Sequence, residues 1–130
     1  MAGPFIFIAT NKLKPGKLDR ERERALELSA FIDANEPRLL GFNEYADESG
    51  EEVGVVQIHP DVESMRSHIE LVRERATRAY EETLDATTSI QVFGPPDEAL
   101  LQMLREQAGA GVQITVKAHH LAGFTRSAKA

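Results

Sequence analysis

Cysteine and tryptophan are absent from this chain of 130 residues, and its aromatic side chains are only six phenylalanines and two tyrosines. The lack of cysteine excludes disulfides, catalytic thiols and metal sites with cysteine ligands. No apolar run approaches the roughly 20 residues that a membrane-spanning helix needs. The N-terminal residues also lack the basic segment and long apolar core of a signal peptide. We therefore expect a cytoplasmic protein without a membrane partner.

Positive charge is also scarce, since 15 Lys and Arg residues stand against 21 Asp and Glu residues and the net charge is −6. An acidic surface repels phosphate backbones, so nucleic acid is not an expected partner. The hydrophobic fraction of 42% and the charged fraction of 28% are ordinary for a globular protein. The length suits one domain, residues 1–130, with a core that needs no metal or disulfide.

Hydrophobic periodicity and turn residues predict an α+β fold. The expected elements are a strand at 5–10, a helix at 18–35, strands at 39–45 and 52–59, a helix from about 62 to 84, a strand at 87–93, a short helix after Asp97 and a strand at 112–120. The first six elements follow the βαββαβ order of ferredoxin-like folds, with an antiparallel sheet. An additional C-terminal αβ unit follows them.

Six residues of alternating charge, 19–24, stand near the start of the first predicted helix. Opposite charges three residues apart, such as Asp19 with Arg22 and Glu21 with Arg24, attract each other on a helix surface. We therefore expect this run to support the exposed face of the helix.

Two predicted strands are apolar on both faces, which predicts a homodimer. The apolar residues are Phe5 to Ala9 in one strand, and Val53, Val55, Val56 and Ile58 in the other. A single layer of helices covers only one face of an antiparallel sheet. Burying each large side chain of the other face is worth roughly 1.5–3 kcal/mol. The sheet of a second copy is the simplest cover, and the alternative is that the C-terminal segment covers this face.

Three stretches resemble the dimeric α/β barrel superfamily, and most of all its antibiotic biosynthesis monooxygenase-like domains. They are residues 9–17 (ATNKLKPGK), residues 37–45 with Gly41, and residues 55–68 with Ser64 and His68. The resemblance implies a dimeric α/β barrel. Members of the superfamily include cofactor-independent oxygenases of quinol-like aromatics, haem-degrading enzymes and proteins without known activity, so the fold alone does not choose among them.

Asn11 lies in an Ala-x-Asn-x-Leu setting similar to that of a functional asparagine in the haem-degrading members. Its amide can donate a hydrogen bond to a bound oxygen species or a substrate oxygen. The alternative is that Asn11 only ends the strand. Haem-degrading members also use a helical histidine and a tryptophan. Residues 73–80 contain no histidine and the chain has no tryptophan, so we expect no haem or other cofactor.

His68 lies beside the apolar stripe of the second predicted helix, three residues after Met65 and four before Val72. Its side chain can therefore face a pocket between this helix and the sheet. An imidazole titrates near neutral pH and can act as a general base toward a phenolic hydroxyl. A histidine at this position also recurs in the resembling domains. The alternative is a structural histidine at the edge of the helix.

Three further residues are predicted to bind substrate, each with a structural alternative. His59 ends a strand before Pro60, where it would otherwise make a structural hydrogen bond. Tyr80 would place its ring in the core and its hydroxyl at the rim of a pocket. Glu44 would be an acid in the pocket, unless it faces solvent as most carboxylates do.

Metal and phosphate-binding signatures are missing from the sequence. His119 and His120 are adjacent, and adjacent strand residues point to opposite faces, so they do not readily share one ion. No HExxH, GxGxxG or GxxxxGK[ST] pattern is present. We therefore expect no metal.

The sequence leaves two functions open. In the first, His68 deprotonates a small aromatic or quinol-like substrate, Asn11 orients the anion, and dioxygen reacts directly without metal or flavin. In the second, the dimer binds a small ligand or serves as an accessory unit without catalysis. A cavity of about 300 Å³ or more beside His68 and Asn11 favours the first function, and a filled interior favours the second.

Overall fold

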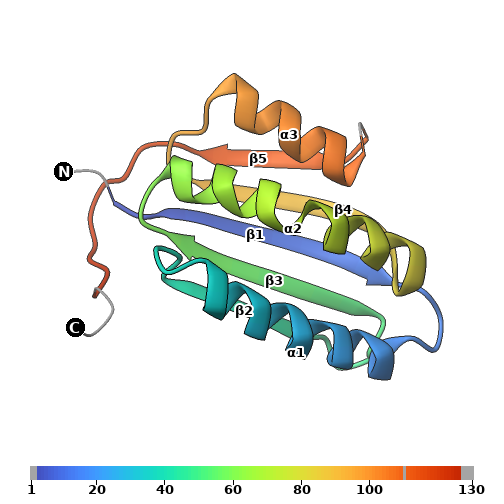
Figure 1. The fold of residues 1–130 in the computed structure, drawn as a ribbon. Coiled ribbons are helices and arrows are strands. Elements are labelled where there is room, and N and C mark those ends of the chain that lie inside the picture. The colour runs from blue at the N-terminus through green and yellow to red at the C-terminus, as the bar shows by residue number, and fades with distance from the viewer. Residues whose placement is uncertain (1–2, 110, 127–130) are drawn as a thin grey trace.

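The computed structural model describes residues 3–109 and 111–126, and in this part of the chain three helices pack on one face of a five-stranded sheet (Figure 1). The strands are β1 (Phe5–Leu13), β2 (Gly41–Ala46), β3 (Glu52–His59), β4 (Leu84–Phe93) and β5 (Gln113–Lys117), and the helices are α1 (Leu18–Asn35), α2 (Val62–Glu82) and α3 (Glu98–Ala108). The strand order is β2-β3-β1-β4-β5. The first six elements have the predicted βαββαβ order.

Two aspartates fix where α2 and α3 begin. The carboxylate of Asp61 accepts a hydrogen bond from the backbone N–H of Ser64 at 2.9 Å. The carboxylate of Asp97 accepts one from Leu100 at 2.8 Å. Such caps satisfy N–H groups of the first turn, which have no partner within the helix. The caps therefore confirm the helix starts that the sequence predicts at these residues.

The predicted antiparallel sheet is wrong at one edge, so the sheet is mixed. β5 runs parallel to β4, with Ile114 opposite Ile90. Parallel neighbours need a crossover connection, and α3 supplies it. β5 is also shorter than the predicted strand 112–120. It ends at Lys117, whose carbonyl accepts a hydrogen bond from the N–H of Gly94 at 2.9 Å.

The main core lies between the helices and the central strands. Its buried residues are Phe5, Phe7, Ala9, Met65, Ile69, Ile90, Val92, Leu100 and Leu104. Strand side chains alternate between the two faces of the sheet, so every second residue of β1 from Phe5 to Leu13 is buried against the helices. This alternation also brings the polar Asn11 of β1, Gln57 of β3 and Thr87 of β4 into the interior.

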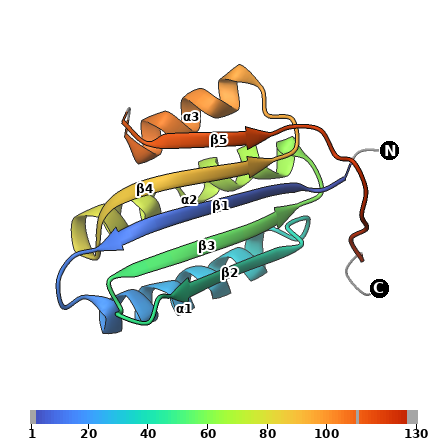
Figure 2. The same cartoon turned by 180° about the vertical axis from the view of Figure 1, so that it is seen from behind.

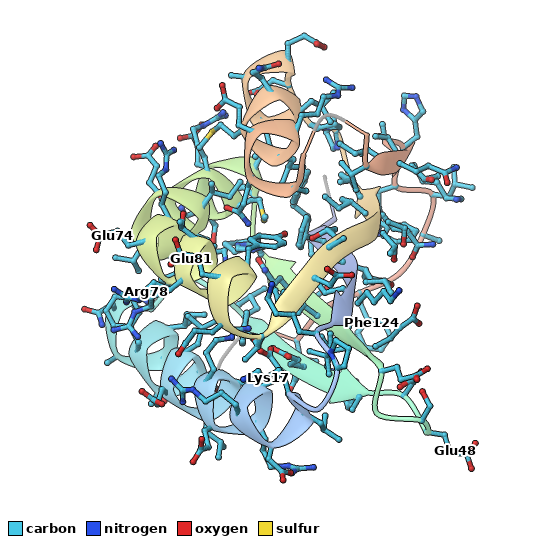
Figure 3. All side chains as sticks on the ribbon, turned by 90° about the vertical axis from the view of Figure 1, so that its right-hand side faces the viewer. Lys17, Glu48, Glu74, Arg78, Glu81 and Phe124 are labelled. Carbon is cyan, nitrogen blue, oxygen red and sulfur yellow. The ribbon has the colours of Figure 1, made fainter. Side chains whose placement is uncertain are left out.

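The face of the sheet opposite the helices is not covered by the described residues (Figure 2). It carries five partly exposed apolar side chains: Ile6, Ile8, Val56, Ile58 and Phe93. α3 packs on the helix side, and residues 118–126 run past the ends of the strands. Figure 3 shows Phe124 on this open side, whereas Glu74 and Arg78 project from the outer surface of α2. The described C-terminal segment therefore does not cover the face.

Candidate functional site

A cavity of about 90 Å³ lies between the sheet and all three helices. Four of the five predicted site residues line it: Asn11 from β1, Glu44 from β2, and His68 and Tyr80 from α2. The fifth, His59, is not part of its wall. At about 30 Å³ per water molecule, the cavity has room for roughly three waters. It is therefore smaller than the 300 Å³ that would favour catalysis over a non-catalytic role.

His68 forms a buried pair with Glu36. Nδ1 of His68 lies 2.8 Å from Oε2 of Glu36, and only 5% and 8% of the two side chains are exposed. A carboxylate beside Nδ1 selects the tautomer that carries its proton there, so Nε2 is left as an acceptor. Nε2 makes no hydrogen bond with any described residue. His68 therefore has the arrangement of a general base on the cavity wall.

His59 is fully buried and both of its ring nitrogens are engaged. Nδ1 lies 2.7 Å from Oγ of Ser64, and Nε2 lies 2.9 Å from Oε1 of Gln57. Because the glutamine oxygen can only accept, Nε2–H donates to it and Nδ1 accepts from the Ser64 hydroxyl. Burial, and then the neighbouring His68, lowers the pKa of His59 to about 3. His59 is thus a neutral structural residue in this geometry, with no free group for a substrate.

Tyr80 and Asn11 are joined through Thr87 of β4. The Thr87 hydroxyl donates to Oδ1 of Asn11 at 2.6 Å. The Tyr80 hydroxyl is hydrogen-bonded to the same Thr87 oxygen, so Tyr80 donates and Thr87 accepts. Oδ1 of Asn11 is therefore fixed, and its two N–H donors make no hydrogen bond with any other described residue. This orientation leaves amide donors on the cavity wall.

His68 and Asn11 lie toward opposite ends of the cavity. The ring of His68 is 6.0 Å from that of Phe42, which stands across the sheet in the same row as Phe7. Asn11 is four residues further along β1, or roughly 13 Å of extended strand. One small aromatic ring does not span this length. This separation does not agree with the expectation that both residues hold the same small anion. Each residue would instead face a different part of a ligand in the cavity.

Glu21, Arg24 and Glu44 form a buried charged cluster between α1 and β2. Nε and Nη2 of Arg24 donate to the two carboxylate oxygens of Glu21 at 2.8 and 2.6 Å, and the Thr83 hydroxyl donates to Glu21 at 2.6 Å. The prediction that this charge run lies on an exposed face is correct for Asp19, which is 97% exposed, and wrong for Glu21, which is 2% exposed. Glu44 is also buried rather than solvent-facing.

Glu44 holds a proton in this cluster while Glu21 is ionised. Burial, and then the Glu21 carboxylate, raises the pKa of Glu44 to about 9. Burial alone raises the pKa of Glu21, but hydrogen bonds from Arg24, Glu44 and Thr83 outweigh it and lower that pKa below its ordinary value. Arg24 lies closer to Glu21 than to Glu44, at 2.6 Å against 3.9 Å, which explains why Glu44 is the neutral partner.

The raised pKa of Glu44 predicts that Glu44→Gln stabilises the protein at high pH. In the unfolded chain Glu44 ionises near its ordinary pKa of 4.5, whereas the folded chain keeps the proton up to about pH 9. The free energy of unfolding then falls between these pH values, by at most about 1.4 kcal/mol per pH unit. Urea unfolding at pH 5 and 8.5 should show a smaller decline for Glu44→Gln than for wild type. The exposed Glu48→Gln should behave like wild type, and equal slopes for all three proteins would contradict the assignment.

Among residues 3–109 and 111–126, no three His, Asp or Glu side chains lie together in a way that could hold a metal ion. No helix in that part of the chain is long and apolar enough to cross a membrane.

Several solved structures share this arrangement at low sequence identity. MupZ from Pseudomonas fluorescens matches with a TM-score of 0.68 at 16% identity, over 95% of this chain and 91% of its own. PA3566 from Pseudomonas aeruginosa matches with a TM-score of 0.60 at 20% identity, over 71% and 93%. A protein from Caulobacter crescentus, named as a candidate antibiotic biosynthesis monooxygenase, matches with a TM-score of 0.62 at 19% identity, over 70% and 88%. The chain has the antibiotic biosynthesis monooxygenase-like fold. No family model and no curated protein matches the sequence.

Among the three structures of the antibiotic biosynthesis monooxygenase-like fold named above, MupZ matches the largest share of this chain. The match covers 95% of this chain, so fewer residues are left unmatched than the 16 that α3 and β5 together comprise. The similarity to MupZ therefore extends into the C-terminal αβ unit. α3 also contributes Leu104, Gln107 and Ala108 to the cavity wall. The C-terminal αβ unit is therefore part of the candidate site as well as an extension of the sheet.

Proposed function

We propose that this chain is a cofactor-independent monooxygenase of small aromatic or quinol-like substrates. The observation that carries the proposal is the His68–Glu36 pair, with a free Nε2 on a cavity that also presents the Asn11 amide. Solved structures of the same fold include one protein named as an antibiotic biosynthesis monooxygenase and others named as candidates for it, which supports this reaction class.

In the proposed reaction, Nε2 of His68 removes a proton from a phenolic hydroxyl of the substrate. Glu36 stabilises the imidazolium that forms, because its carboxylate accepts the Nδ1–H bond. The Asn11 N–H donors lie at the other end of the cavity, where they hold a second oxygen only of a substrate longer than one aromatic ring. The deprotonated ring is electron-rich and supplies the electrons to dioxygen itself, so the proposal requires no metal or flavin. One oxygen atom replaces hydrogen on a ring carbon, and the other leaves as water with the two hydrogens that the substrate loses.

Oxygen consumption tests the proposal. We expect purified protein in the presence of a chelator to consume dioxygen with a series of quinols and naphthols faster than they autoxidise. Labelled dioxygen should place one oxygen atom in the product, which mass spectrometry detects. Rates equal to autoxidation across the whole series would reject the proposal.

The small cavity favours a second candidate function, a non-catalytic dimer that binds a small ligand or serves as an accessory unit. An aromatic ring needs more room than about 90 Å³, since a cavity that takes up benzene measures about 150 Å³. Substrate binding therefore requires side chains of the wall to move. Ligand binding without oxygen consumption in the experiment above would favour this second function.

We also propose that two copies pair through the open face of the sheet. Light scattering should give twice the 14.4 kDa of one chain. Ile8→Glu should yield monomers, because a buried carboxylate in a dry interface is strongly unfavourable. Leu71→Glu, which places the same charge at a partly exposed position of α2, is the matched control and should remain dimeric. A monomeric wild-type protein would contradict the pairing.

A further inference from the structure

Glu44 and Phe42 of β2 separate the inner cavity from a second hollow. This outer groove has a volume of about 320 Å³ and lies between α1 and β2. Phe42 and Glu44 line both spaces, whereas Leu26 and Tyr45 line only the groove. The two volumes together fall within the 300–1,000 Å³ typical of small-molecule sites. Glu44 is therefore placed where a ligand would reach from the groove toward the cavity.

The carboxyl group of Glu44 is buried, and no described residue donates a hydrogen bond to it. Only 7% of its side chain is exposed, and neither oxygen accepts a hydrogen bond from a described N–H or O–H group. The nearest cation is Nη2 of Arg24, which lies 3.9 Å from Oε1 and binds Glu21 at 2.6 Å instead. Buried polar atoms nearly always have a partner. A missing donor at the junction of two cavities indicates a place for a ligand.

The protonation of this cluster decides which kind of partner Glu44 needs. The charged groups that face it are Glu21 and Arg24 of α1. Glu44 keeps its proton and donates it to the ionised Glu21, and this hydrogen bond is one cause of the raised pKa of Glu44. The other oxygen of Glu44 is then a carbonyl-type acceptor that lacks a donor. A ligand with a hydroxyl group supplies that donor.

We propose that Glu44 accepts a hydrogen bond from an aromatic hydroxyl group at the junction between the groove and the cavity. Phe42, Leu28 and Val55 line the cavity beside it and offer apolar surface to the ring. The site then selects phenols over hydrocarbons of the same shape. This inference rests on the proposed function in taking an aromatic hydroxyl as the ligand, but it concerns binding and requires no turnover.

The inference is tested by titrating the protein with three single-ring probes while its amide chemical shifts are recorded by NMR. p-Cresol carries a hydroxyl, toluene carries no oxygen, and acetophenone carries only an acceptor. We expect p-cresol to bind about tenfold more tightly than toluene, with shifts in residues 42–46. Acetophenone should bind no more tightly than toluene. Shifts elsewhere only, or an equal gain for acetophenone, would overturn the assignment of Glu44 as acceptor.

Variants at position 44 separate Glu44 from the other polar residues. Glu44→Gln should keep the preference for p-cresol, because the amide oxygen accepts and the NH₂ group donates to Glu21. Glu44→Leu should bind p-cresol and toluene equally, and Glu48→Gln in the exposed turn should match wild type. A preference that survives Glu44→Leu would assign the hydroxyl to another residue.

The outcome also separates this inference from the proposed function. A preference for p-cresol over toluene without oxygen uptake would reject the proposed oxygenase activity but support the binding site at Glu44. Oxygen uptake without the preference rejects only the role of Glu44.

Discussion

Replacing His68 with alanine is expected to lower the rate of oxygen uptake by about 10²–10⁴-fold, the usual effect of losing a general base. Nε2 of His68 is the one imidazole nitrogen of the cavity wall that is free to accept a proton, since His59 lies outside the wall. Uptake should be measured with an oxygen electrode at saturating quinol. Added imidazole should restore part of the rate, because the substitution leaves a space of matching shape.

Two variants serve as controls for this result. His119→Ala removes an exposed histidine and should leave uptake unchanged. Glu36→Gln keeps the His68 ring but removes the charge that stabilises its protonated form, so we expect a smaller loss than for His68→Ala. His68 is buried, and thermal unfolding must therefore show that His68→Ala is folded. Unchanged uptake by folded His68→Ala would remove this residue from the mechanism.

Replacing Arg24 with methionine is expected to cost about 3–5 kcal/mol of unfolding free energy at pH 7, because it strands a buried charge. The Arg24 side chain is 14% exposed and makes two hydrogen bonds to Glu21, which is 2% exposed. Without Arg24, the donors left for Glu21 among the described residues are Thr83 and the protonated Glu44. The loss should be smaller at pH 5, where Glu21 takes up a proton more readily.

Urea unfolding measures this loss, and two further variants test its cause. Arg22→Met removes an exposed arginine of the same helix, which forms a surface ion pair with Asp19, and should change stability by less than about 1 kcal/mol. The double variant Glu21→Gln with Arg24→Met should recover part of the loss, because it removes both charges. A loss in Arg24→Met no larger than that in Arg22→Met would show that the buried pair does not stabilise the fold.

Hydrophobic periodicity, together with the proline and glycine residues near their ends, predicts α1 and β3 with the correct bounds. The border between α2 and β4 was predicted less well. Leu84 fits the helical repeat as well as a strand, so the helix was expected to reach it. The carbonyl of Thr83 instead accepts a hydrogen bond from the N–H of Lys14 at 2.8 Å, and β4 begins one residue later. This tertiary contact has no local signal. The parallel pairing of β5 likewise depends on the crossover through α3.

Only part of the candidate site was predictable from the sequence, because its contacts between distant segments also have no local signal. Helical spacing places His68 and Tyr80 toward the interior, whereas Asn11 is a candidate only through the resemblance to haem-degrading domains. The partner of His68 is Glu36, 32 residues earlier, and no pattern connects two residues so far apart. The pair of Glu21 and Arg24 has the same i,i+3 spacing whether it faces solvent or the core, so its burial was not foreseeable. The separation of His68 from Asn11 follows from strand register, which the sequence does not specify.

The two edge strands of the sheet, β2 and β5, are its shortest, with six and five residues. An edge strand presents unpaired backbone groups on which another chain can add a strand, and a short edge offers few of them. Growth of this sheet into fibrils by edge-to-edge addition is therefore disfavoured. In the proposed dimer the chains associate through the broad face instead, where a two-fold contact closes on itself and cannot propagate.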